Sequence, residues 1–219
     1  MKVLLFGATG MIGQGVLREC LLDPRIEDVR SVVRRPSGIT HPKLTEIVHG
    51  DFFDCAAIEG QLTGLDACFF CLGVTSTGLT EAAYRRVTVD LTLAAATTLC
   101  RLNPAMTFCF VSGAGSDSTE RGRVMWARVK GQAENVLLRQ PFKSVYVFRP
   151  GAIRPLHGIR SRTRLYRMFY TVLGPFLPLL KAFSPDSLTT TEQLGRAMIR
   201  AGLEGAPKPV LEMADINRL

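Results

Sequence analysis

A chain of 219 residues, of which 47% are hydrophobic and 21% are charged, has the length and composition of one ordinary globular domain. No stretch approaches the roughly 20 consecutive apolar residues that a membrane-spanning helix needs, which argues against an integral membrane protein. The net charge of +8 favours anionic ligands, but the chain has no zinc-finger, helix-turn-helix or RNA-binding motif, so nucleic acid is not an expected partner.

The N-terminus lacks the pattern of a secretory signal. One lysine precedes a short apolar run that ends at Gly7, and no small-residue cleavage site follows. We therefore expect a cytoplasmic protein whose six cysteines are reduced thiols.

Cys68 and Cys71 have the spacing of a metal or redox motif, but they lie in a run that predicts a buried strand. Residues three apart on a strand point to opposite faces, so we interpret both as small hydrophobic residues. The three histidines are too scattered to form a metal site, and no metal is expected; they are His41, His49 and His157.

Strand and helix patterns alternate over the first 150 residues. The apolar run KVLLF (2–6) predicts a strand buried on both faces, and the helical spacing of apolar residues over 11–22 predicts a helix that stops before Asp23. The same patterns predict further strands over 28–33, 43–50, 66–72, 106–112 and 144–150, and helices over 80–102, with Thr80 as its cap, and 123–139.

Strands separated by helices predict an α/β fold with a doubly wound parallel sheet of the Rossmann type. We expect a single domain over 1–219, with a cofactor-binding core over 1–152 and a short C-terminal lobe over 153–219 for a substrate or partner. Ligands of such sheets bind at the carboxyl ends of the strands, where the strand order reverses.

The C-terminal lobe departs from this alternation. Residues 153–183 are basic at first, then apolar and broken by prolines, and 189–205 have the pattern of a helix with a capping threonine. The basic residues would suit an anionic substrate, an acidic partner or peripheral contact with a membrane, or would form a solvated loop; they are Arg154, Arg160, Arg162, Arg164 and Arg167.

A glycine-rich loop joins the first predicted strand to the first helix. Gly7 would allow a tight turn, Gly10 would let the backbone approach a pyrophosphate, and Gly13 would let the helix pack close to the sheet. The helix N-terminus adds free N–H groups and the positive end of a dipole. The loop therefore predicts a dinucleotide site formed by Gly7, Thr9, Gly10, Met11, Ile12 and Gly13.

Arg34 and Arg35 follow the second predicted strand, about 20 residues after the loop. NAD-binding folds usually hold an acidic residue there, whereas a guanidinium suits the 2′-phosphate of NADP. We therefore expect NADP(H) to be preferred over NAD(H), the alternative being a solvated basic turn.

Two further segments follow predicted strands at the same edge. Asp51, next to Phe52, could contact the adenine amino group, or it could cap the helix that begins near Asp54. Leu72 and Gly73 follow the fourth strand, where a small residue lets the chain pass a cofactor ribose.

Five segments, taken together and in order, resemble the atypical and extended short-chain dehydrogenase/reductase superfamily, and most closely its Tat-interacting-protein-like branch. The resemblance covers residues 1 to about 155, and the segments are GATGMIG, CLGVTS, FVSGAGSDS, ARVKGQAE and FRPGAIRP.

The resemblance implies an active site with a serine after the fifth strand and a Tyr-x-x-x-Lys pair on the next helix. Lys130 matches the lysine, which would hold the nicotinamide ribose, and it is followed by Gly131 and Glu134 as in the branch. Ser112 is the candidate serine, with Ser116 as the alternative.

Trp126 stands at the tyrosine position, and an indole N–H donates a hydrogen bond but cannot act as a general acid near neutral pH.

The resemblance also implies that the segment with Pro150 and Gly151 runs past the nicotinamide. It assigns Arg149 a structural rather than a catalytic role. The implied function is an oxidoreductase on a small molecule. A nucleotide-sugar epimerase is a weaker alternative, because the C-terminal segment is short for binding a sugar nucleotide.

The tryptophan leaves three explanations open. The protein binds NADP(H) without carbonyl chemistry and works as a sensor or regulator with a protein partner. Alternatively, another group handles the proton, with Tyr84, His157, Ser112 and bound water as candidates. In the third, the hydride acceptor is a quinone-like or flavin-like molecule that needs no strong acid.

Overall fold

Seven parallel strands form the central sheet of the computed structural model, which describes residues 1–159 and 188–219. Their spatial order is β3 (Leu44–Val48), β2 (Asp28–Val33), β1 (Lys2–Phe6), β4 (Ala67–Phe70), β5 (Thr107–Val111), β6 (Ser144–Arg149) and β9 (Val210–Glu212). The order reverses between β1 and β4, which is the topological switch point. The doubly wound parallel sheet predicted from the sequence is confirmed.

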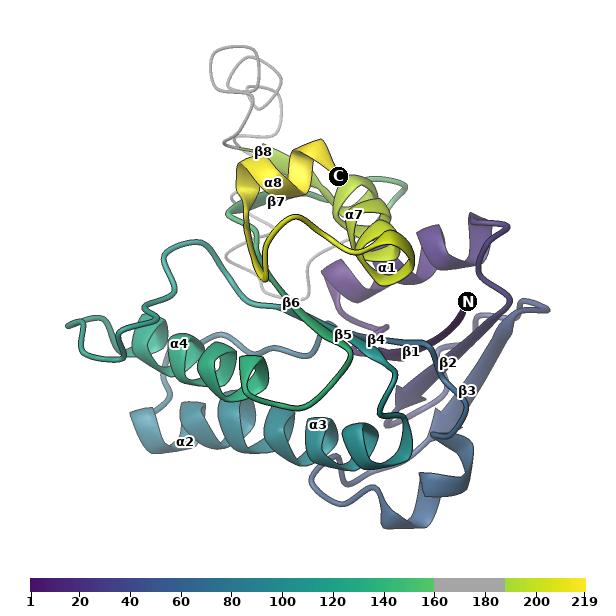
Figure 1. The fold of residues 1–219 in the computed structure, drawn as a ribbon, viewed down its shortest axis with the longest axis horizontal. Helices are drawn as coiled ribbons and strands as arrows, with labels where there is room; N and C mark the ends of the chain where they lie inside the picture. The colour runs from purple at the N-terminus through teal and green to yellow at the C-terminus, as the bar shows by residue number, and fades with distance from the viewer. Residues whose placement is uncertain (160–187) are drawn as a thin grey trace.

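Helices cover both faces of this sheet (Figure 1). One face carries α1 (Met11–Leu22), α7 (Thr191–Glu204) and α8 (Met213–Arg218). The opposite face carries α4 (Met125–Leu138) and a long helix made of α2 (Glu81–Arg85), the π-helical turn η2 (Arg86–Asp90) and α3 (Leu91–Leu102). The long helix is the one predicted over 80–102, and Thr80 caps it by accepting the Ala83 N–H at 3.3 Å.

The side chains of β1 divide between two apolar cores. Leu4 and Phe6 pack toward α3 and α4, whereas Val3 and Leu5 pack toward α1 and α7. All of these side chains are fully buried, which is why the strand is a continuous apolar run rather than an alternating one.

Cys68 and Cys71 confirm the prediction of opposite faces. Cys68 belongs to the core on the α3 side, and Cys71 packs against the core on the α1 side. Burial raises the pKa of both thiols, as expected for cysteines that serve as small apolar residues.

The C-terminal part contains more secondary structure than its sequence predicts. The expected helix over 189–205 is α7, and Thr190 caps it by accepting the Gln193 N–H at 3.0 Å. Before it, β8 (Leu188–Thr190) pairs with β7 (Ala152–Arg154) in a small second sheet. Neither these two strands nor β9 and α8 were predicted. Most of the basic stretch, from Arg160 to Arg167, lies outside the described residues.

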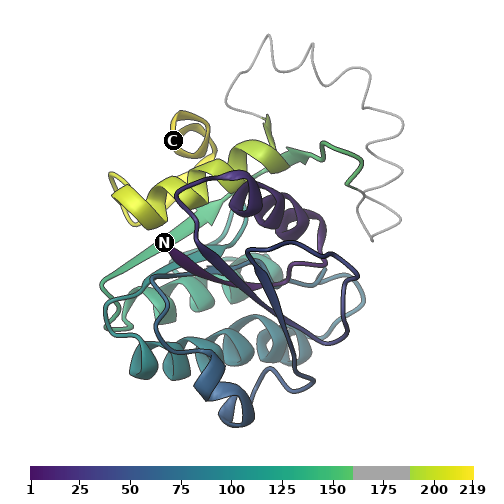
Figure 2. The same ribbon diagram turned by 90° about the vertical axis from the view of Figure 1, so that its right-hand side faces the viewer.

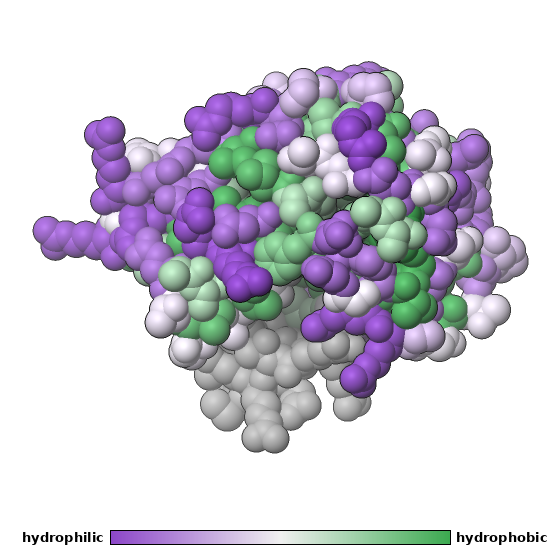
Figure 3. All heavy atoms as spheres, turned by 90° about the horizontal axis from the view of Figure 1, so that it is seen from below, coloured by the Kyte–Doolittle hydropathy of each residue, from purple (hydrophilic) through white to green (hydrophobic). Residues whose placement is uncertain are grey.

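The surface over α2, α3 and α4 carries hydrophilic side chains with apolar ones interspersed between them (Figure 3). Within residues 1–159 and 188–219, no helix is both long enough and apolar enough to cross a membrane.

Two glycines allow α1 and α7 to lie side by side (Figures 1 and 2). A Cβ atom on Gly15 would lie 2.6 Å from the Cβ of Thr191, and one on Gly195 would lie 2.9 Å from the Cγ of Glu19. Both distances are shorter than van der Waals contact, so each position excludes even a methyl group.

We predict that Gly15→Ala lowers the free energy of unfolding by about 1–3 kcal/mol, because the added methyl separates α1 from α7. Alanine otherwise favours a helix by about 1 kcal/mol over glycine, so a net loss reports the packing. Gly60→Ala is the control, since a Cβ there meets no atom within 4 Å. Equal urea unfolding curves for the two variants would contradict the prediction.

Candidate cofactor and active site

The loop between β1 and α1 is shaped by glycines that cannot be replaced. Gly7 has a φ of +83°, and a Cβ on it would lie 2.7 Å from the carbonyl of Cys71. A Cβ on Gly13 would lie 2.0 Å from the carbonyl oxygen of Gly7. The tight turn and the close helix packing predicted for these two glycines are therefore both present.

The first turn of α1 is open to an anionic ligand. Gly10 is its N-cap residue and has no side chain to satisfy the first N–H groups, and the first turn holds no acidic residue. The Thr9 carbonyl accepts a hydrogen bond from the Gln14 side-chain amide at 3.1 Å. Met11 and Ile12 are partly buried and pack against the apolar core on the α1 side. These free N–H groups and the helix dipole fit a pyrophosphate.

Arg34 and Arg35 lie directly after β2, the strand next to β1, and both are exposed. Neither side chain makes a hydrogen bond or ion pair with any residue in the described part of the chain. Their guanidinium groups are thus available to a phosphate, as the predicted NADP(H) preference requires.

Asp51 and Phe52 follow β3. Asp51 is exposed and accepts the Phe53 N–H at 2.9 Å, whereas the short helix η1 (Ala56–Gln61) begins after its N-cap residue Cys55, and the Ala56 N–H is accepted by Asp54 at 2.8 Å. Of the two roles considered for Asp51, capping is therefore wrong. The Phe52 ring is buried edge-on against Phe6, with 6.0 Å between ring centroids, so only its backbone is free for a ligand.

The other predicted cofactor residues also follow strands at this edge of the sheet. Gly73 comes after β4 and Leu72, and a Cβ on it would meet nothing within 4 Å. Pro150 follows β6 and accepts the Ala114 N–H at 2.9 Å, which ties this segment to the loop after β5. Gly151, next in the chain, is exposed.

Lys130 lies on α4 beside the loop after β5. The side chain is half-buried, and its Cε is 3.8 Å from the position of a Cβ on Gly113. Its ammonium group makes no hydrogen bond or ion pair within the described ranges. Burial lowers the pKa of Lys130 to about 8, although the nearby Glu134 carboxylate opposes the shift.

Gly131 explains how Lys130 is held. A Cβ at this position would lie 1.8 Å from the carbonyl oxygen of Asp117, so the loop after β5 rests directly on the helix. Asp117 in turn accepts the N–H groups of Thr119 and Gly122 at 3.0 and 2.6 Å, which shapes the loop.

Trp126 lies one helical turn before Lys130. Its side chain is partly buried against the core, and its Cη2 atom is 3.5 Å from the position of a Cβ on Gly115, which has a φ of +83°. The ring therefore packs on the loop after β5, at the position where the resemblance implies a tyrosine.

Ser112 belongs to a buried polar network that the sequence did not predict. Its hydroxyl donates to Glu134, and it lies 3.0 Å from the Ser116 hydroxyl. Glu134 is fully buried and pairs with Arg149, whose Nε is 3.2 Å from each carboxylate oxygen. Arg149 also contacts Glu212 at 3.0 Å.

The sequence signal for this network is Glu134, an acidic residue on a face of α4 that is otherwise made of small and apolar residues. Its partners are not visible in the sequence, because Arg149 and Glu212 approach only when β6 and β9 take their places in the sheet.

The two other candidates for proton transfer have other contacts. The Nε2 atom of His157 lies 2.7 Å from Glu192 at the start of α7, and this hydrogen bond lowers the pKa of Glu192. Tyr84 lies on α2 and is buried in the core on the α3 side of the sheet.

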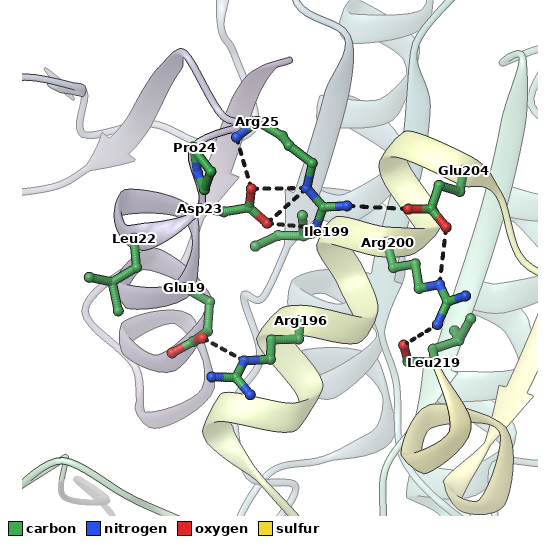
Figure 4. A pocket seen from close by; sticks show the side chains of 10 residues that line it. All are labelled: Glu19, Leu22, Asp23, Pro24, Arg25, Arg196, Ile199, Arg200, Glu204 and Leu219. Atoms are coloured by element: carbon green, nitrogen blue, oxygen red, sulfur yellow. Dashed lines mark hydrogen bonds and ion pairs between the residues drawn. The ribbon is translucent and has the colours of Figure 1, made fainter.

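A pocket of about 560 Å³ lies between the C-terminal end of α1 and α7, at the opposite end of α1 from the glycine loop (Figure 4). Its three arginines are already paired, Arg25 with Asp23, Arg196 with Glu19 and Arg200 with Glu204. The pocket is therefore lined by neutralised ion pairs rather than by free charges.

The family model for NAD(P)H-binding proteins matches residues 7–154, more than half of the chain. The relative named fmp52, mitochondrial, from Emericella nidulans is 28% identical over 215 residues, which cover 93% of this chain and 88% of the relative. FMP52, mitochondrial, from Saccharomyces cerevisiae is 29% identical over 168 residues, which cover 75% and 69%.

Solved structures share the fold at low identity. MoeE5 in complex with UDP-glucuronic acid and NAD has a TM-score of 0.72 and 19% identity, covering 97% of this chain and 76% of MoeE5. The enzyme WbmH of Bordetella bronchiseptica in complex with NAD+ has a TM-score of 0.68 and 14% identity, covering 96% and 74%. The PhqB reductase domain of Penicillium fellutanum has a TM-score of 0.70 and 17% identity, covering 98% and 67%.

These comparisons correct one prediction and leave another untested. The cytoplasmic location expected from the sequence is contradicted, because the relatives are named as mitochondrial proteins. The narrower Tat-interacting-protein-like branch stays a prediction. With the family match, the doubly wound fold and the glycine loop in agreement, the chain belongs to the NAD(P)H-binding family.

Proposed function

We propose that the protein is an NADP(H)-dependent oxidoreductase that acts on a small organic molecule. The observation that carries the proposal is Lys130, a half-buried lysine with a pKa lowered to about 8 and no partner among the described residues. Desolvating an ammonium group without a partner is costly, and such groups cluster at functional sites. A ligand with hydroxyl acceptors, such as a nicotinamide ribose, would provide the missing partner.

The other groups of the site fit the same ligand. The glycine loop and the start of α1 suit the pyrophosphate, and the two exposed arginines after β2 suit a 2′-phosphate. A bound nicotinamide would supply or accept a hydride. In this chain Lys130 would hold the ribose, while the Trp126 indole could donate a hydrogen bond to a substrate without transferring a proton.

A second function is favoured by Trp126 itself. A site that binds the cofactor but lacks the tyrosine suits a regulator or sensor that engages a protein partner. The two functions separate on NADPH oxidation with a panel of quinones and aldehydes. Turnover that disappears in Lys130→Ala supports the enzyme, whereas a silent panel with cofactor bound supports the regulator.

We predict that NADPH binds at least tenfold more tightly than NADH, a difference of about 1.4 kcal/mol, because the arginine pair contacts the 2′-phosphate. Arg34→Ala/Arg35→Ala should remove the difference and leave NADH binding unchanged. Arg139→Ala, which removes an exposed arginine at the end of α4, should leave the difference in place. Nicotinamide fluorescence measures the wild type and both variants, and equal affinities of the wild type for NADPH and NADH would remove the role of the arginines.

We predict that NADPH binding weakens roughly tenfold between neutral pH and pH above 9, the loss of about 1.5 kcal/mol expected for one charge-assisted hydrogen bond. Because the Lys130 pKa is lowered to about 8, the ammonium group is present below that pH and is lost as the pH rises through it. Nearby Arg149 stays protonated over this range, because its hydrogen bond to Glu134 raises its already high pKa.

Lys130→Met keeps the length of the side chain without its charge, so its NADPH affinity should not change with pH. Lys143→Met, at an exposed lysine, is the matched control and should behave as the wild type. A wild-type affinity that is flat across this pH range would contradict a role for the Lys130 ammonium.

We also predict that Trp126→Tyr raises NADPH-dependent carbonyl reduction, since it restores a proton donor one helical turn before Lys130. Steady-state rates with aldehydes measure the effect, together with NADPH affinity as a check of the fold. A variant that folds and binds cofactor without any gain in rate would show that more than the tyrosine is missing.

A further inference from the structure

The hydrogen of the Ser112 hydroxyl is committed to a buried carboxylate. Ser112 retains 7% of its surface, its Oγ contacts an oxygen of Glu134, and Glu134 is completely buried. A hydroxyl has a single hydrogen, so the partner that receives it decides what Ser112 offers to any other group.

Arg149 fixes the charge of that partner. Its Nε lies 3.2 Å from each oxygen of Glu134, and its remaining donors contact Ser118 at 2.6 Å and Glu212 at 3.0 Å. A guanidinium is permanently protonated, and a carboxylate paired with it is ionised and accepts hydrogen bonds without donating any. The Ser112 hydrogen therefore points to Glu134, where the bond is charge-assisted.

Ser116 does not change this polarity. Its hydroxyl donates either to the Gly113 carbonyl, at 2.8 Å, or to Ser112, at 3.0 Å. In both cases the Ser112 oxygen keeps at least one lone pair and has no hydrogen left to give. A ligand carbonyl also only accepts hydrogen bonds, so its lone pairs would be placed against those of the Ser112 oxygen.

The loops at this edge carry exposed apolar side chains. Val74 and Leu79, after β4, are 50% and 38% exposed, and Val124, before α4, is 52% exposed. An ion pair of 2.7 Å between Arg128 and Glu81 holds the start of α4 next to the start of α2. A ligand at this edge meets apolar surface together with one oriented oxygen acceptor.

We infer that Ser112 accepts a hydrogen bond from its ligand, so that the site selects an apolar alcohol or phenol over the corresponding carbonyl compound. The inference rests on the proposed function in that Ser112 lies in the substrate site, and Glu134 and Arg149 are positioning residues that set its polarity. The substrate class is then a molecule whose hydroxyl form is bound together with the oxidised cofactor.

The test compares two probes of similar size, 4-ethylphenol, which offers a hydroxyl donor, and acetophenone, which offers only an acceptor. Both are titrated into the protein with and without NADP+, a cofactor form with which neither probe reacts. Trp126 is the one tryptophan of the sequence, so its single indole N–H resonance reports occupancy of this site by NMR. We expect 4-ethylphenol to bind at least tenfold more tightly than acetophenone.

Glu134→Gln should reverse this preference. Arg149 needs an acceptor, so the amide oxygen of the glutamine stays with the guanidinium and its NH2 group turns to Ser112 and donates. The Ser112 hydrogen is then free for a carbonyl, and acetophenone becomes the tighter probe. Glu27→Gln, at an exposed glutamate, is the matched control and should keep the wild-type preference.

Ser112→Ala should bind both probes with similar affinity, and it keeps the test valid if Glu134→Gln does not fold. Equal binding of the two probes to the wild type, tighter binding of acetophenone, or no shift of the Trp126 resonance up to the solubility of either probe would each overturn the inference. Failure of NADPH to bind would instead contradict the proposed function, and the titrations without cofactor would still decide the polarity of Ser112.

Discussion

The buried contact between Glu134 and Arg149 connects the elements on which the site depends. It joins α4 to β6, and through Glu212 it reaches the end of β9, while Ser112 attaches the end of β5 to the same carboxylate. Breaking a buried ion pair by removing one partner typically costs about 3–5 kcal/mol, because the remaining charge has no compensation. The contact therefore fixes geometry at the carboxyl edge of the sheet more than it adds net stability.

Elsewhere at the same edge, main-chain segments pack directly against one another. Gly7 and Gly13 let β1, the loop and α1 come closer than any side chain permits, and Gly131 does the same for the loop after β5 and α4. In both places the missing side chain puts a rigid main-chain segment beside a helix. Close main-chain packing at a glycine thus shapes both the glycine loop and the position of Lys130.

Much of this architecture could be predicted from the sequence, and the exceptions have physical reasons. Strands of four to six residues such as β1 and β4 are buried on both faces and form apolar runs that stand out. β8 and β9 have three residues each, too few to show a period, and β9 is set by its pairing with β6. Cellular location was mispredicted because it depends on targeting signals read by receptors, which composition does not encode.

The candidate site likewise has parts that could be predicted from the sequence and parts that could not. The glycine loop, Lys130 and Trp126 could be found because their spacing along the chain is the signal. The polarity of Ser112 could not, because it depends on Arg149, which comes close only through the pairing of β5 with β6.

Two cations of different kinds lie near Glu134, and the difference between them bears on the missing tyrosine. Arg149 is permanently charged, and its donors are taken by Glu134, Ser118 and Glu212, whereas Lys130 has a pKa of about 8 and makes no hydrogen bond or ion pair in the described chain. With Trp126 in place of the tyrosine, Lys130 has no phenol whose pKa it could lower. In the proposed function its charge would act on the ligand alone, by holding acceptor groups in place, and a proton that leaves or enters the substrate would come by way of solvent or the ligand itself.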